Sequence, residues 1–74
     1  MAEEKVESEV TGTVWKVLVE VGTQVAEEEP LMILESMKME IPVEAPCAGK
    51  VSELLVNPED QVEEGQIVAV LDRD

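Results

Sequence analysis

The sequence predicts an all-β fold made by duplication of one unit. A shift of 37 residues (49 − 12) aligns residues 12–35 with residues 49–72 without a gap. Thirteen valines, three isoleucines and three threonines favour extended backbone, and glycine or proline interrupts every short apolar run. The identical pairs are Gly12/Gly49, Val14/Val51, Leu18/Leu55, Val19/Val56, Gln24/Gln61, Val25/Val62, Glu27/Glu64 and Leu34/Leu71.

The segment that precedes the duplication, residues 1–9, has no apolar stripe with a 3.6-residue period. It is therefore expected to be flexible or extended. The domain itself is expected to span residues 10–74.

Two apolar runs of the first unit predict strands. In residues 15–21 alternate side chains share one face, and Trp15 is expected in the core or at its edge. Residues 31–34 are apolar on both faces, as expected where two halves pack around one core.

Residues 39–44 alternate between apolar and polar side chains and predict another strand. Met39, Ile41 and Val43 are expected to face inward. Because Pro42 cannot donate a hydrogen bond to a neighbouring strand, this strand is expected at a sheet edge, or Pro42 at its start.

The acidic stretches, residues 27–29 and 59–64, are expected to form turns. They show no regular spacing of ligands, so no metal site is predicted. The first unit has Glu28 where the second has Gly65, and this turn is expected to close differently in the two units.

A very tight turn is predicted between the strands that end at Glu35 and resume at Met39. Two-residue hairpin turns favour Asn-Gly, because both residues adopt positive φ. Here the long side chains of Met37 and Lys38 stand in the turn, and such breaks of a local rule are typical of functional sites. The turn is expected to hold Lys38 in solvent.

Composition excludes several functions. A chain of 74 residues makes one domain with no room for a separate substrate pocket, and it has no histidine, so an independent enzyme is not expected. The net charge of −13 repels nucleic acid and anionic lipid. With no signal-like start and no long apolar run, a cytoplasmic protein is expected. Cys47, the single cysteine, is expected to be an inert packing residue.

Three short motifs carry a family resemblance. They are Glu-Ser-Met-Lys-Met-Glu-Ile-Pro at residues 35–42, Ala-Pro-Cys-Ala-Gly at residues 45–49, and Glu-Gly-Gln at residues 64–66. Together they resemble the biotinyl domain of biotin carboxyl carrier proteins, and most of all the small stand-alone biotin/lipoyl attachment proteins. The resemblance implies a flattened β-barrel (barrel-sandwich hybrid) of two four-stranded antiparallel sheets, with a quasi-twofold internal repeat and an acceptor lysine on an exposed hairpin.

The resemblance also assigns roles to residues of the hairpin. Lys38 would be the covalent biotin acceptor, and Met37 and Met39 would be recognised by biotin protein ligase and by the carboxylase. Ser36, which stands where the family usually has alanine, would flank the site together with Glu35 and Glu40.

The implied function is that of a non-catalytic biotin carboxyl carrier, which shuttles CO2 as carboxybiotin between a biotin carboxylase and a carboxyltransferase. A lysine amine is protonated at neutral pH, so the ligase would have to supply the base that frees it. Two alternatives share the fold: a lipoyl carrier domain and an unmodified structural barrel-sandwich module. Lipoyl acceptors resemble Asp-Lys-Ala at this turn, whereas Lys38 has methionine on both sides.

Overall fold

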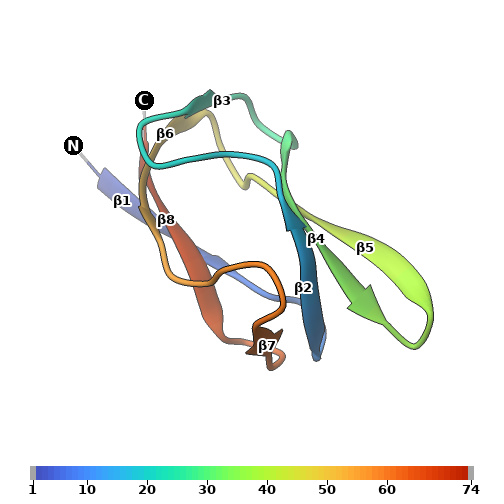
Figure 1. Ribbon diagram of the computed structural model, residues 1–74. Helices are drawn as coiled ribbons and strands as arrows, with labels where there is room; N and C mark the ends of the chain where they lie inside the picture. Colours follow the sequence, from blue (N-terminus) through green and yellow to red (C-terminus); the bar gives the residue numbers. More distant parts are fainter. Residues whose placement is uncertain (1, 74) are drawn as a thin grey trace.

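The computed structural model describes residues 2–73, which form eight β-strands and no helix. The strands make two four-stranded antiparallel sheets, with the orders β1-β8-β6-β3 and β5-β4-β2-β7 (Figure 1). The predicted all-β fold with two four-stranded sheets is confirmed. The strands are β1 (Ala2–Glu7), β2 (Gly12–Val17), β3 (Gln24–Val25), β4 (Pro30–Ser36), β5 (Met39–Glu44), β6 (Gly49–Leu54), β7 (Gln61–Val62) and β8 (Ile67–Arg73).

The duplication covers more residues in the structure than in the alignment of the sequence with itself. Adding 37 to the bounds of β1, β2, β3 and β4 gives the bounds of β5, β6, β7 and β8, and the same shift converts one sheet order into the other. Only Met37 and Lys38 lie between the two repeats. The acceptor turn predicted above therefore joins the two halves of the molecule.

The repeat includes the N-terminal segment that was expected to be flexible or extended. Residues 2–7 form β1, which pairs along its length with β8 at the other end of the chain. A sequence signal for this strand exists, because Glu3, Val6 and Glu7 are identical to the residues that follow 37 positions later.

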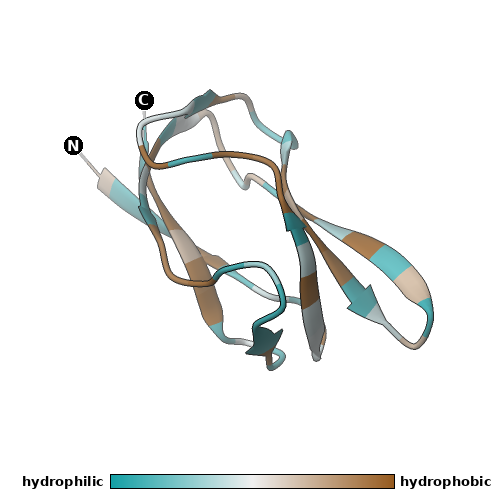
Figure 2. Cartoon of the chain, in the orientation of Figure 1, coloured by the Kyte–Doolittle hydropathy of each residue, from teal (hydrophilic) through white to brown (hydrophobic). Residues whose placement is uncertain are grey.

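The core lies between the two sheets and is almost wholly aliphatic. Residues 31, 32 and 34 of β4 are fully buried, as their apolar run predicted. Hydrophobic and hydrophilic residues alternate along β5 (Figure 2). The core cluster comprises Val6, Val14, Val19, Val25, Leu31, Met32, Leu34, Val43, Ala45, Val51, Val56, Val62, Val68, Ala69 and Leu71.

A β-bulge corrects the expected position of Trp15. The register between β2 and β4 shifts between Val14 and Lys16, which leaves Trp15 as an extra residue in β2. Val14 points into the core, whereas the Trp15 side chain is 50% exposed. Trp15 was expected in the core or at its edge, and it does not belong to the core cluster, because simple alternation cannot count the residue that a bulge inserts.

The turns correct a second expectation. Glu28 has a φ of 69° and donates its backbone N–H to the Ala45 carbonyl oxygen, and Gly65 has a φ of 87° and donates to the Ser8 carbonyl oxygen, both at 2.8 Å. The two turns therefore close in the same way. The glutamate adopts the left-handed conformation that glycine adopts at lower cost in the other repeat.

Candidate functional site

The β4–β5 hairpin ends in the two-residue turn that the sequence predicted. Ser36 pairs with Met39, and between them Met37 and Lys38 have φ values of 51° and 65°. Two successive positive φ values are characteristic of a type I′ turn. For residues other than glycine this conformation costs about 1–2 kcal/mol each, so the rest of the hairpin must hold it in place.

The turn presents its side chains to solvent. Lys38 is exposed and Met37 is 92% exposed. Within the described part of the chain, no carboxylate forms a salt bridge with the Lys38 ammonium group. The amine is therefore sterically accessible to a second protein.

The expectation that Met39 faces inward was wrong. Its side chain is 63% exposed, whereas Ile41 is partly buried and Val43 is buried. The reason is that burial declines toward the tip of the hairpin, where β4 and β5 extend past the core. Met37 and Met39 therefore flank Lys38 as two exposed apolar side chains. The expectation that the strand with Pro42 lies at a sheet edge is confirmed.

Acidic side chains stand on both strands below the turn. Glu35 and Glu40 are paired across the hairpin, and both are exposed. Like charges directly opposite each other destabilise a strand pair, so this pair does not serve the stability of the hairpin. It places negative charge beside the exposed lysine.

A hydrogen bond anchors the tip of the hairpin. The Ser36 hydroxyl donates to the Thr11 carbonyl oxygen at 2.8 Å, and the Thr11 hydroxyl accepts from the Glu64 backbone N–H at 3.2 Å. Gly12 makes the approach possible, because a Cβ there would lie 2.6 Å from the Glu35 carbonyl oxygen. Sequence reasoning missed the roles of Thr11 and Gly12, although the repetition of Gly12 as Gly49 was a signal for a close contact.

The six residues predicted for the site all lie at or next to the turn. The structure places Glu35, Ser36, Met37, Lys38, Met39 and Glu40 in one continuous hairpin tip. In Figure 1 this tip lies at the opposite end of the molecule from both chain termini.

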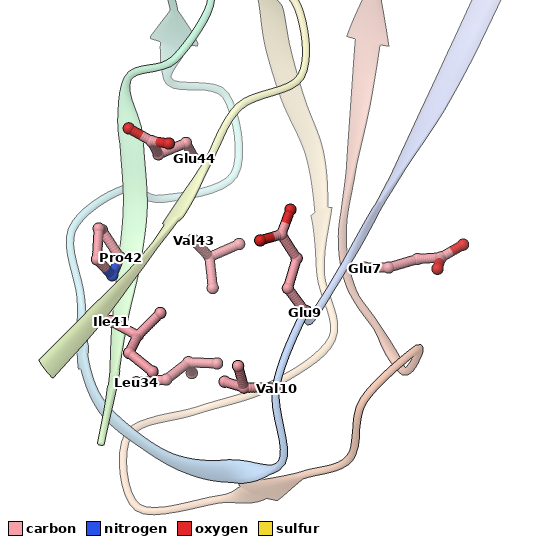
Figure 3. A pocket seen from close by; sticks show the side chains of 8 residues that line it. All are labelled: Glu7, Glu9, Val10, Leu34, Ile41, Pro42, Val43 and Glu44. Atoms are coloured by element: carbon pink, nitrogen blue, oxygen red, sulfur yellow. The ribbon is translucent and has the colours of Figure 1, made fainter. Parts of the chain in front are cut away.

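A small hollow between β5 and the segment after β1 does not include the lysine (Figure 3). Its volume is about 70 Å³, whereas small-molecule sites usually measure about 300–1,000 Å³. Val10, Leu34 and Ile41 lie close together at one end of it, and Glu7 points away. This hollow therefore lacks the volume for a bound cofactor.

Two further findings concern residues 2–73 only. No group of three or more histidine, cysteine, aspartate or glutamate side chains in this range is placed to hold a metal ion. The same range contains no helix with the length and apolar character needed to cross a membrane.

Comparison with known proteins places this geometry in a family. The family model described as "Biotin-requiring enzyme" matches residues 3–71. The chain is 44% identical over 68 residues to the biotinylated protein TB7.3 homolog of Mycobacterium leprae (strain TN), covering 92% of this chain and 96% of that protein. It is 52% identical over 54 residues to the biotin carboxyl carrier protein of Streptococcus mutans serotype c (strain ATCC 700610 / UA159), covering 73% of this chain and 42% of that protein.

The solved structure of the urea carboxylase of Kluyveromyces lactis contains the same fold. It superimposes with a TM-score of 0.92 at 39% sequence identity, over 97% of this chain and 6% of that much longer one. The chain belongs to the biotin/lipoyl attachment family, as the hairpin motif indicated.

Proposed function

We propose that this chain is a biotin carboxyl carrier in which Lys38 holds biotin by an amide bond. The observation that carries the proposal is the position of Lys38 in an exposed two-residue turn with methionine on both sides. The family match and the carrier relatives identify biotin as the cofactor. The chain itself is a carrier and catalyses neither the attachment of biotin nor the carboxylation.

Attachment requires only an accessible amine from this chain. The Lys38 nitrogen attacks the activated carboxyl carbon of biotinyl-adenylate, the carbon–oxygen bond to AMP breaks, and a base on the ligase takes the proton that the amine loses. The lysine thereby loses its positive charge. The exposed turn allows this attack because no part of the fold has to open.

Transport follows from the position of the turn. Held by Lys38, biotin would supply the ureido nitrogen that carries CO2 from a biotin carboxylase to a carboxyltransferase. Because the carrier tethers the group, the effective concentration at both sites is raised without a high affinity for either. Biotin protein ligase, biotin carboxylase and carboxyltransferase are therefore the proposed partners, and the lipoyl alternative is not favoured by the carboxylase relatives.

The test is the intact mass of the chain after co-expression with a biotin protein ligase in excess biotin, followed by peptide mapping. One biotinyl group on the peptide that contains Lys38 is the expected result. The Lys38→Arg variant serves as the control: it keeps the positive charge and the fold but accepts no biotin. A lipoyl group, a biotinyl group on Lys5, Lys16 or Lys50, or a folded but unmodified chain would contradict the proposal.

A further inference from the structure

The duplication provides an internal comparison between the half that carries Lys38 and the half that does not. Side chains that the fold requires recur at equivalent positions, as Val14 and Val51 do in the core. Where a surface side chain differs between the halves, the fold does not require that particular side chain. The clearest difference is Trp15, the only aromatic residue of the chain, whose equivalent 37 positions later is Ser52.

Trp15 contributes to a shallow groove of about 380 Å³ at the side of the acceptor hairpin. The groove is formed by β2, by the end of β4 and by the turn between β6 and β7. Its lining residues are Thr13, Val14, Trp15, Glu35, Pro58 and Glu59.

Backbone hydrogen bonds hold this groove in place. The Glu59 N–H donates to the Val14 carbonyl oxygen, and the Val14 N–H donates to the Asp60 carbonyl oxygen, both at 2.7 Å. A turn from the second repeat is thereby fixed against a strand from the first. Glu35, which also lines the groove, lies three positions before Lys38 in the same hairpin.

The carboxylate of Glu59 is a second difference between the halves. Glu59 has a φ of 79°, whereas Gly22, its equivalent in the first repeat, has a φ of 96° without a side chain to strain. Glycine would relieve the backbone at position 59 at no steric cost. Glu28 shows the same strain where the other repeat has Gly65, but of these two glutamates only Glu59 lines the groove.

The groove has the chemistry of a site for a basic side chain. Glu35 and Glu59 line the groove together with the half-exposed Trp15. The face of this indole already accepts a cation, since the Lys16 ammonium lies 5.2 Å from the ring centroid. An arginine or lysine that protrudes from a partner can place its aliphatic stem on the indole and its charge between the carboxylates.

We propose that this groove is a contact surface for biotin protein ligase, through a basic side chain of the ligase. The inference rests on the proposed function. The ligase has to reach the Lys38 amine itself, so its surface comes close to the hairpin and to the groove beside it. A carboxylase acts on the ureido end of biotin and not on the Lys38 amine, so its chemistry does not require contact with the groove.

The main test measures kcat and KM for biotinylation by a purified biotin protein ligase. Trp15→Ser introduces the residue of the other repeat and is expected to lower kcat/KM about fivefold, equivalent to ~1 kcal/mol, mainly through KM. Leu55→Ser is the matched control: Leu55 is 51% exposed, close to the 50% of Trp15, but does not line the groove. It is expected to leave kcat/KM unchanged.

A second pair of variants distinguishes a lost contact with the ligase from a loss of stability of the domain. Glu59→Gly and Glu28→Gly both relieve a positive φ, and both are expected to raise the melting temperature. Only Glu59→Gly is expected to lower kcat/KM, because Glu28 lies at the other end of β4 from the turn. A drop in ligation alongside a gain in stability cannot be explained by loss of the fold.

Direct contact is detected in the Lys38→Arg chain, which binds the ligase without reacting. This chain contains one tryptophan, so labelling with 5-fluorotryptophan gives one fluorine resonance at position 15. The resonance is expected to shift or broaden on addition of unlabelled ligase, and less so at high salt.

The outcomes distinguish the inference from the proposed function. If the parent chain accepts no biotin, both are overturned. If the parent is biotinylated at Lys38 and Trp15→Ser is biotinylated at the same kcat/KM, the groove is not a ligase contact and only the inference is overturned. Unchanged ligation together with slower carboxylation by a cognate carboxylase would assign the groove to the carboxylase instead, and would also overturn the inference.

Discussion

The Ser36 hydroxyl donates a 2.8 Å hydrogen bond to the Thr11 carbonyl oxygen, and this bond ties the last residue of β4 to the residue that precedes β2. It links the base of the Lys38 turn to the body of the domain. The usual alanine of the family cannot make it. Lys38 is thus presented on a hairpin whose tip is held from the side as well as by its own strand pairing.

Removal of this bond is expected to loosen the turn. Ser36→Ala should lower the free energy of unfolding by about 0.5–1 kcal/mol, since the bond is exposed to competing water. It should also accelerate amide hydrogen exchange at residues 37–39. The control is Ser52→Ala, which removes a 3.1 Å serine bond to the Val70 carbonyl oxygen in the other sheet. Equal exchange at residues 37–39 in both variants would mean that Ser36 does not restrain the turn.

A substitution that relieves the strained turn is expected to raise the stability of the domain and to slow biotinylation. Met37 has a φ of 51° and is 92% exposed, so its side chain contributes no core packing. Met37→Asn should raise stability by about 0.5–1 kcal/mol, or roughly 4 °C in melting temperature, because asparagine tolerates this conformation. Biotinylation should become slower in the same variant. Calorimetry with a ligation assay checks both, and a loss of stability in the Met37→Asn variant would show that Met37 makes a stabilising contact.

The two glycines that head β2 and β6 form a matched pair. A Cβ at Gly12 would lie 2.6 Å from the Glu35 carbonyl oxygen, and one at Gly49 would lie 2.5 Å from the Asp72 carbonyl oxygen. Gly12→Ala and Gly49→Ala should each cost about 1–3 kcal/mol in urea unfolding, because backbone has to move. Only Gly12→Ala should slow ligation, since only Gly12 lies against the acceptor hairpin. Similar ligation rates for the two variants would show that the close approach at Gly12 is not needed for the presentation of Lys38.

Equivalent substitutions in the two halves of the core are expected to lower the stability by similar amounts. Leu34 and Leu71 are equivalent, and both are fully buried. Leu34→Ala and Leu71→Ala should each lower the free energy of unfolding by about 2–5 kcal/mol, because each leaves a cavity between the sheets. In a domain of this size that loss approaches the whole stability, so circular dichroism at 37 °C should show partial or complete unfolding. A much smaller effect at one position would indicate that the two halves of the core are not equivalent.

The sequence alone determined the duplicated all-β architecture and the place of the site. The spacing of Gly12/Gly49 and of the valines depends only on which side chains face inward, and this periodicity is visible without a structure. The two-residue turn was predictable from the chain length available between Glu35 and Met39. Lys38 was singled out because Met37 and Lys38 stand where the local rule for such a turn favours asparagine and glycine.

Only the tertiary structure shows where the pairing of strands overrides the preferences of the local sequence. β1 contains four charged residues in six and becomes a strand only because its backbone groups pair with β8, some sixty-five residues further along the chain (67 − 2). The bulge at Trp15 depends on the register between β2 and β4, which a single strand does not encode. It turned the one tryptophan from an expected core residue into an exposed one beside the acceptor hairpin. Alternation within a strand predicts that one face is apolar and the other polar. Hydrogen bonding to distant strands determines which face packs against the core and which is exposed.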